Sequence, residues 1–262
     1  MLQMPDALLM LQAIILGMGR TLGMVLFLPF LSRQNTSIMI RGAVSLGLSL
    51  PVAFGLWPLL VKAPLSMPMV MMLAMKEVML GALLGMLAAL PFWAIRGMGT
   101  LIDNQRGANA AQQVNPSLQA DATLIGELAE RGLVALLVQW GMLQTVFMVL
   151  TESLDPWPVL ALLPDLSTHR HEILSALANL VTQALVLAGP VLLALLLVEL
   201  GLAIASTAVQ GFDVYASGLA VKTLLALFVL LLVSPAVLEH QGETAIRWWR
   251  EGLPAVLGLR PT

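Results

Sequence analysis

The chain has 262 residues, of which 59% are hydrophobic and 11% are charged, and its formal net charge is −2. A soluble globular domain is about 25% charged, so this composition excludes an ordinary soluble protein and a disordered one. The balanced charge leaves no basic footprint for nucleic acid, and the absence of cysteine excludes disulfides, thiolate metal sites and a cysteine nucleophile.

Long apolar segments dominate the chain. The hydrocarbon core of a bilayer is about 30 Å thick and is crossed by about 20 helical residues. Six segments reach this length, at about 7–31, 38–60, 67–95, 128–150, 173–209 and 216–238. None alternates polar and apolar residues as a barrel strand does. The sequence therefore predicts an all-α, polytopic membrane protein whose six long apolar helices are partly broken and arranged as hairpins.

Prolines lie within or near the ends of these segments. Each removes a backbone donor and kinks or ends a helix; the four are Pro51, Pro91, Pro190 and Pro235. The segment 173–209 is too long for one simple crossing, and we expect two stacked pieces with a bend near Pro190.

Two long connections separate the apolar segments. The first, 96–130, is polar and contains a run of small and amide residues: Gly107, Ala108, Asn109, Ala110, Ala111, Gln112 and Gln113. Asn115 followed by Pro116 is typical of a helix start, with the asparagine as N-cap and the proline at the first helical position. The second connection, 152–172, is rich in proline and is predicted to be an irregular loop.

The C-terminal tail, 239–262, contains Arg247-Trp248-Trp249-Arg250. Tryptophan beside arginine is typical of a membrane interface, so the tail is predicted to lie there. Residues 1–262 are expected to form a single domain.

Five charged residues inside apolar segments are candidates for a role: Arg20, Lys76, Glu77, Glu199 and Lys222. Each costs about 2.5–3.5 kcal/mol at the centre of a membrane helix, so each should face protein or water. They could form a proton or ion relay, or ion pairs that lock helices or subunits together. The ion-pair interpretation is favoured because relays are chains of acidic groups and only two of the five are acidic.

The spacing of these charges predicts particular pairings. Glu199 and Lys222 flank one short turn and are expected to pair. Lys76 and Glu77 are adjacent on a helix and should point in different directions, so they are expected to serve two neighbours and not to pair with each other.

Two glycine motifs, Gly19-x-x-x-Gly23 and Gly81-x-x-x-Gly85, allow close helix packing. His169 and His171 could hold a metal with Asp165, but their proline-rich surroundings favour a solvated loop. There is no nucleotide-binding loop, nucleophile elbow or zinc-protease motif. We therefore expect no catalytic residue, metal or cofactor.

Several of these features, taken in order, resemble one family. Arg20, Pro29 and Arg41 are spaced like its arginine, proline and arginine, and Lys76-Glu77 with Gly81 and Gly85 is similar to its Lys-Glu-x-x-x-Gly-x-x-x-Gly segment. The chain resembles, over nearly its whole length, the T subunit of the type III secretion export apparatus (the SctT/FliR family).

Two further stretches carry the resemblance. Gly99 to Gly107, with Asp103, Gln105 and Arg106, is similar to the Gly-x-x-x-Asp-x-Gln-Arg-Gly stretch of the injectisome branch. Near the C-terminus the family has Pro-Gln-Leu-Asn-Val-Phe and then Pro-x-Lys. Here both prolines are absent, Asp213 stands in place of the asparagine, and Lys222 is kept.

The resemblance implies a function. Such a protein joins the R and S subunits in a helical complex of the bacterial inner membrane, within the basal body of the secretion machine, and also meets the U and V subunits and the inner rod. The complex forms the channel for unfolded secreted proteins, and part of the apolar surface contacts lipid. Residues Gly107 to Gln113 would lie at the channel axis as a gate loop, and Asp103, Arg106 and Asp213 join the intramembrane charges as assembly or ion-pair candidates.

Three other interpretations remain open. The first is a flagellar paralogue, against which the Asp103-x-Gln105-Arg106-Gly107 stretch favours the injectisome. The second is a stand-alone proton-coupled transporter that uses Glu77 or Glu199, although the two halves show no convincing repeat. The third is a membrane enzyme such as a lipid-modifying transferase, for which no catalytic constellation is present.

Overall fold

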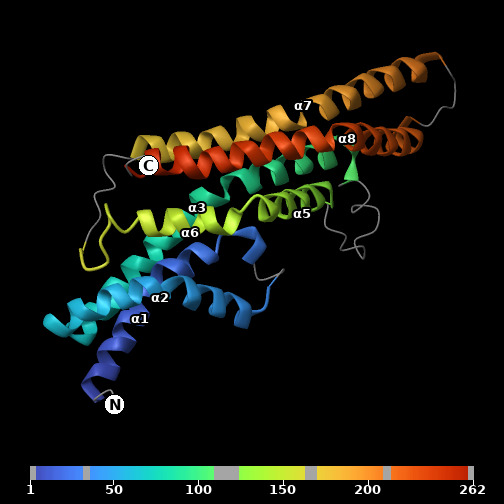
Figure 1. The fold of residues 1–262 in the computed structure, drawn as a ribbon. Helices are drawn as coiled ribbons and strands as arrows, with labels where there is room; N and C mark the ends of the chain where they lie inside the picture. The colour runs from blue at the N-terminus through green and yellow to red at the C-terminus, as the bar shows by residue number, and fades with distance from the viewer. Residues whose placement is uncertain (1–3, 32–35, 109–123, 163–169, 209–213, 259–262) are drawn as a thin grey trace. The chain divides into compact units, whose positions relative to one another are not determined.

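The computed structural model describes residues 4–31, 36–108, 124–162, 170–208 and 214–258, and this part of the chain contains helices and no strand. A 3-10 turn, Pro29–Leu31, follows the first helix, and a π-helical turn, Trp248–Gly252, precedes the last. The helices are α1 (Met4–Val25), α2 (Ile38–Lys62), α3 (Met67–Arg106), α5 (Leu124–Gln139), α6 (Met142–Glu152), α7 (Arg170–Ala208), α8 (Val214–Arg247) and α9 (Leu253–Val256) (Figure 1).

Five of the described helices are long and apolar enough to cross a membrane, and α5 with α6 makes a sixth candidate as a bent pair. The predicted all-α, polytopic membrane fold is thus confirmed. The 40 residues of α3 span about 60 Å at 1.5 Å per residue, about twice the hydrocarbon thickness.

The chain forms two compact units. Unit 1 comprises Met1–Leu90, Gly141–Ala176 and Ile246–Thr262, and unit 2 comprises Pro91–Trp140 and Leu177–Ala245. Each unit is therefore assembled from segments that are far apart in the sequence.

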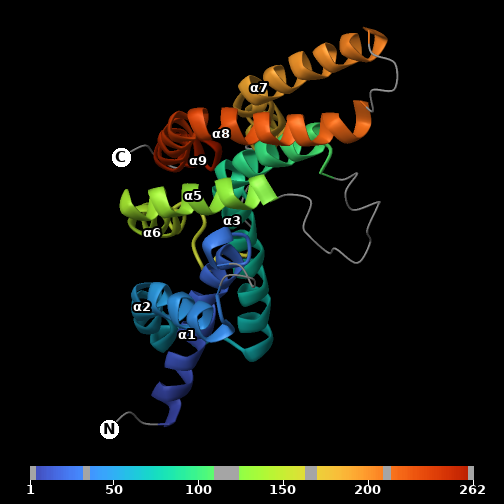
Figure 2. The same cartoon turned by 90° about the vertical axis from the view of Figure 1, so that its right-hand side faces the viewer.

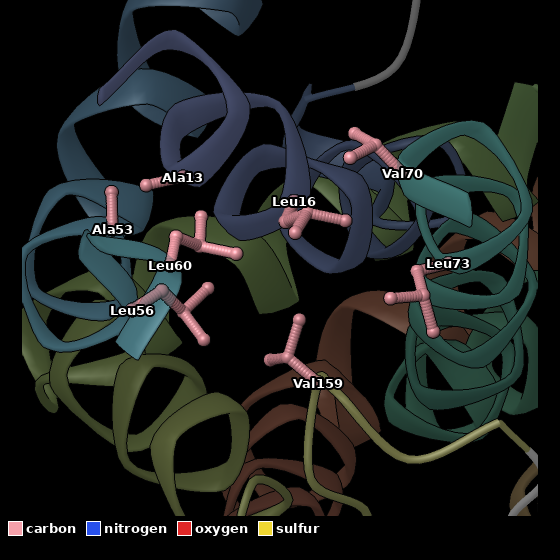
Figure 3. Packing of buried hydrophobic residues seen from close by; sticks show 8 residues of the cluster. All are labelled: Ala13, Leu16, Ala53, Leu56, Leu60, Val70, Leu73 and Val159. Carbon is pink, nitrogen blue, oxygen red and sulfur yellow. The ribbon is translucent and has the colours of Figure 1, made fainter. Parts of the chain in front are cut away.

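The core of unit 1 lies between the antiparallel helices α1 and α2 and the first part of α3. Figure 3 shows its centre, where small and branched side chains from the three helices meet Val159 from the loop after α6. Alanine on both members of the α1–α2 pair, at positions 13 and 53, lets the two backbones approach closely. The cluster comprises Ala13, Leu16, Ala53, Leu56, Leu60, Val70, Leu73 and Val159.

Unit 2 contains the α7–α8 hairpin together with α5 and the second part of α3. Its buried side chains include Ile95, Ile102, Leu133 and Leu195. The outer faces of the hairpin are uncovered: only 22% of the most apolar window of α7 and 6% of that of α8 are buried. Such leucine-rich faces are stable only against lipid or another protein.

The helix boundaries differ from the sequence prediction in three places. The predicted span 128–150 is two helices, since Gly141 adopts the left-handed conformation (φ 83°) between α5 and α6. Residues 170–208 form one continuous helix through Pro190, so the prediction of two stacked pieces was wrong, although α7 changes direction along its length (Figure 2). One missing N–H bends a long helix without ending it when the neighbouring turns keep their hydrogen bonds.

The third difference concerns the ends of α3 and α8. Helix α3 continues to Arg106 and α8 to Arg247, so helix replaces part of the predicted connection and part of the predicted tail. The proposed helix start at Asn115 lies outside the described residues, and α5 is described from Leu124.

Candidate functional site

Two polar clusters stand out among the apolar helices, one in each unit. The first, the Arg20–Glu77 cluster, consists of Arg20, Lys76, Glu77, Ser153 and the carbonyls between Trp157 and Ala161. Arg20 comes from α1, the Lys76-Glu77 pair from α3, and the remaining groups from the segment after α6. All belong to unit 1.

Arg20 is only 2% exposed, and its guanidinium group contacts two parts of unit 1. Its Nε and Nη2 donate to the two oxygens of Glu77, at 2.7 and 3.1 Å. Its Nη1 donates to the backbone oxygen and the Oγ of Ser153, both at 2.9 Å, and Nη2 also donates to the oxygen of Trp157 at 2.7 Å. Five contacts match the five N–H groups of arginine, so the buried cation is fully hydrogen-bonded.

Glu77 is fully buried and lies between two cations. Besides the bidentate contact with Arg20, its Oε1 lies 2.8 Å from Nζ of Lys76. The same Nζ donates to the backbone oxygens of Pro158, Val159 and Ala161 at 3.1, 2.8 and 2.7 Å. The two cations therefore tie α1, α3 and the segment after α6 together through one carboxylate.

This geometry corrects one prediction. Lys76 and Glu77 were expected to point apart and not to pair, and they form an ion pair. The spacing argument concerned their Cβ directions, but the four-carbon stem of lysine lets its Nζ turn back to a carboxylate on the next residue. The expectation of separate neighbours does hold, since only Glu77 contacts Arg20 and only Lys76 contacts the 158–161 carbonyls.

The glycine motifs surround this cluster. A Cβ added at Gly23 would meet the backbone of Val78, and one at Gly81 would meet the backbone of Arg20. A Cβ at Gly19 would lie 2.8 Å from Cβ of Glu77, and one at Gly85 would overlap the backbone of Met24. The α1 and α3 backbones thus touch where the two motifs face each other, as Gly-x-x-x-Gly packing requires.

The second cluster, the helix-end cluster, lies in unit 2 and comprises Asp103, Gln105, Arg106, Glu199 and Lys222. Asp103 is fully buried, and its Oδ2 accepts from the backbone N–H of Ile125 at 3.0 Å. Its Oδ1 accepts from Arg106 Nε at 2.8 Å. A carboxylate near the end of α3 therefore satisfies a free donor in the first turn of α5, where the helix dipole also favours negative charge.

Glu199 links three helices of unit 2. One oxygen accepts from Gln105 Nε2 of α3 at 3.0 Å, and the other lies 3.2 Å from Lys222 Nζ of α8. The expected contact between Glu199 and Lys222 is present, although Glu199 is 53% exposed. Unlike Glu77, this carboxylate is reachable from outside the chain.

The backbone at the end of α3 is shaped by glycine. Gly107 has φ 89° and its N–H donates to Asn104, so α3 ends there with a left-handed cap. A Cβ at Gly99 would overlap the backbone of Gly126, which brings α3 and α5 into direct contact. The ends of both helices are therefore held before and after residues 109–123.

Several predicted site residues lie outside the described part of the chain. Of the gate loop, only Gly107 and Ala108 are described; Asn109, Ala110, Ala111, Gln112 and Gln113 are not, and neither are Asp213 and His169. Among the described residues, no three His, Cys, Asp or Glu side chains lie together as a metal site would need.

Sequence reasoning missed the partners that are not charged. Ser153 and the backbone carbonyls after it accept hydrogen bonds from the cations of the Arg20–Glu77 cluster. No local sequence pattern marks a backbone carbonyl as such an acceptor. The tryptophans of the tail were expected at a membrane interface. Trp249 is instead buried inside the protein, where its Nε1 donates to the Ala88 oxygen.

Comparison with known proteins gives a consistent result. The model of the bacterial export proteins, family 1, matches residues 11–245. The chain is 28% identical over 232 residues to Yop proteins translocation protein T of Yersinia pestis, covering 87% of each chain. It is 32% identical over 228 residues to surface presentation of antigens protein SpaR of Salmonella typhimurium, covering 85% of this chain and 83% of that protein.

A flagellar relative is more distant. Flagellar biosynthetic protein FliR of Bacillus subtilis is 25% identical over 170 residues, covering 64% of this chain and 65% of that protein. The resemblance to the T subunits of type III secretion is thus confirmed, and with its long apolar helices the chain is a multi-pass protein of the bacterial inner membrane. The chain belongs to the bacterial export proteins, family 1.

Proposed function

We propose that the chain is a structural and channel-forming subunit of a type III export apparatus that assembles with R and S subunits into the export gate. The match over residues 11–245 and the relatives from secretion systems support this assignment. Unfolded secreted proteins would pass through the assembled channel, and the U and V subunits and the inner rod would adjoin it.

The observation that carries the proposal is the uncovered apolar surface of α7 and α8. Only 22% and 6% of their most apolar windows are buried, although both helices are much longer than a bilayer is thick. Lipid covers about 20 residues of a helix and leaves the rest in contact with water. Exposure of these apolar residues to water is unfavourable. The partner helices of a multi-subunit gate would cover them along the remaining length.

The gate role of Gly107 to Gln113 is a further part of the proposal. The helix-end cluster supports it, because Asp103 fixes the start of α5 and Gly107 the end of α3, so the intervening segment leaves from two anchored ends. Small and amide side chains suit a closure, since they block ions by size without binding a passing unfolded chain.

The ion-pair arrangement weighs against a stand-alone transporter that carries protons on Glu77. Both oxygens of Glu77 are engaged by Arg20 and Lys76, and Glu77 itself is fully buried, whereas a proton carrier needs a carboxylate that water can reach. The flagellar alternative is disfavoured because the flagellar relative matches less of the chain, at lower identity.

Affinity purification from native membranes tests the assembly role. The tagged chain should retain R and S homologues through detergent extraction and size exclusion. A variant with the same tag and Leu84→Asp in the buried core serves as the misfolded control. Recovery of the intact wild-type chain alone, in a mild detergent that preserves the rest of the basal body, would contradict the proposal.

Deletion of residues 108–113 tests the gate role separately. The complex should assemble at wild-type yield while the membrane leaks ions and small molecules, measured as dye or potassium efflux. Deletion of residues 259–262, far from this segment in sequence, is the control. An assembled deletion complex with wild-type tightness would remove the gate role and leave the assembly role standing.

A further inference from the structure

Pro91 leaves a carbonyl of α3 without its helical partner. In an α-helix the N–H of residue i donates to the carbonyl of residue i−4, so the carbonyl of Leu87 would pair with the N–H that proline lacks. Inside a membrane protein no water is available to donate a hydrogen bond to this carbonyl, and an unpaired carbonyl is unfavourable there.

The chain supplies the missing donor from its C-terminal end. Trp248 Nε1 donates to the Leu87 oxygen at 2.8 Å, across 161 residues of sequence. Its neighbour Trp249 donates to the Ala88 oxygen at 2.9 Å. The second carbonyl differs from the first, because residue 92 is phenylalanine and has an N–H of its own to offer.

A second proline shows what a local repair looks like. At Pro235 of α8 the carbonyl that loses its partner belongs to Leu231, and Ser234 Oγ donates to it at 3.2 Å. That repair comes from the adjoining residue and is complete as soon as the helix forms. The repair at Pro91 requires a donor that is made 161 positions after Leu87.

The backbone around the tryptophans is shaped for this contact. Residues Trp248–Gly252 form a π-helical turn, which is wider than an α-helical one and places successive indoles on α3. A Cβ at Gly252 would overlap the Trp248 ring, so glycine is needed there. Trp249, Leu253 and Leu257 are all buried, which makes this segment part of the core of unit 1.

Unit 1 is built from the first 90 residues, from Gly141–Ala176, and from Ile246 onward. Synthesis runs from the N-terminus, so the Leu87 carbonyl is made about 160 residues before its donor. We propose that residues 246–258 are a completion lock: unit 1 closes only after this segment has been made, and the lock acts through the Trp248 donor on the carbonyl freed by Pro91.

A double-mutant cycle on the full-length purified protein tests the mechanism. Trp248→Phe keeps an aromatic ring and removes the donor, and it should lower the melting temperature by about 2–6 °C. Pro91→Ala restores a backbone N–H to Leu87, so in that background Trp248→Phe should shift the melting temperature by less than about 1 °C.

Trp249→Phe is the matched control, because residue 92 has an N–H that can pair with the Ala88 carbonyl with or without Pro91. Its effect should be the same in both backgrounds. Equal effects of Trp248→Phe in both backgrounds would overturn the proposal. So would a coupling to Pro91 that is as large for Trp249 as for Trp248, since this would point to the shape of the kink and not to the freed carbonyl.

Truncation tests the completion role. A chain that ends at residue 247 should become sensitive to limited proteolysis within residues 1–90 and should fail to co-purify with partner subunits, whereas deletion of 259–262 should change neither. A chain ending at residue 247 that resists protease and assembles as the full chain does would also overturn the proposal.

Discussion

Glu77 is a fully buried carboxylate that contacts two positively charged side chains. Its carboxylate is fully buried between Arg20 and Lys76, and the cluster carries one net positive charge. Backbone carbonyls from Ser153 and from the 157–161 segment face the excess positive charge with their partial negative charges. Removal of the only carboxylate in the cluster leaves the buried Arg20 and the partly exposed Lys76 without a counter-charge, and an uncompensated buried charge is strongly destabilising.

The first prediction follows from this arrangement. Glu77→Gln should destabilise the protein by about 3–5 kcal/mol and reduce recovery of the R-containing complex. Thermal unfolding of the detergent-purified protein and the yield of co-purified R subunit measure the two effects. Glu199→Gln is the control, since Glu199 is half exposed and its loss should cost below about 1 kcal/mol. A Glu77→Gln complex that forms at full yield while secretion stops would favour a relay role.

The second prediction concerns Glu199 and Lys222, whose charged atoms lie 3.2 Å apart. The coupling energy in a double-mutant cycle of Glu199→Gln and Lys222→Gln should be about 0.2–1 kcal/mol, because solvent screens a pair this exposed. The charge swap should recover part of the loss. Zero coupling, both in the isolated protein and in the complex, would remove this pair from the assembly candidates.

At the scale of helices, α1 and α3 meet through backbone. Gly23 and Gly81 have no room for a methyl group, because a Cβ at either position would overlap the backbone of the other helix. This contact also fixes the distance between Arg20 on α1 and Glu77 on α3, so the packing motif and the ion pair depend on each other. The glycines of α2 differ, since Gly47 and Gly55 have nothing within 4 Å of an added Cβ.

The third prediction compares these two kinds of glycine. Gly81→Ala should push α1 away from α3 and destabilise the protein by several kcal/mol, on the order of a strained core substitution or more. Gly47→Ala should be neutral or stabilise by up to about 1 kcal/mol in the isolated protein, because alanine is the better helix former. Circular dichroism on heating measures both. Equal tolerance of the two substitutions would show that α1 and α3 do not touch as described.

For the whole molecule, the exposed apolar surface matters more than any single contact. Leu224 and Leu231 of α8 are each over 70% exposed, whereas Leu84 of α3 is fully buried. An exposed leucine contributes little to the stability of the isolated chain. It contributes binding free energy when lipid or a partner protein covers it.

The fourth prediction separates folding from assembly on this basis. Leu231→Ala should change the stability of the isolated protein by less than about 0.5 kcal/mol yet reduce the amount of complex that survives detergent. Leu84→Ala should cost about 2–5 kcal/mol in the isolated chain. If a combined Leu224→Ala and Leu231→Ala variant leaves complex yield unchanged, this face of α8 contacts lipid and not a partner.

Much of the fold could be predicted from residue order alone. Segments of 20 or more apolar residues form helices in a membrane protein because nothing else satisfies their backbone there, so the helix class and most of the spans followed directly. The two Gly-x-x-x-Gly motifs marked close packing for the same local reason, since the absence of a side chain is a property of the residue itself. The family was visible as well, because spacing along the chain is all that a motif needs.

Tertiary structure alone decided which distant groups meet. The sequence showed that Arg20 and Glu77 are unfavourable inside a membrane helix unless they are paired. The contacts of this cluster with Ser153 and the 157–161 carbonyls depend on how the segment after α6 is placed. The pairing of Lys76 with Glu77 depends on a side-chain conformation that adjacency disfavoured. The indole of Trp248 meets the Leu87 carbonyl freed by Pro91, 161 positions earlier in the sequence, only through the packing of unit 1. Local patterns report what each residue needs, and long-range packing determines which group supplies it.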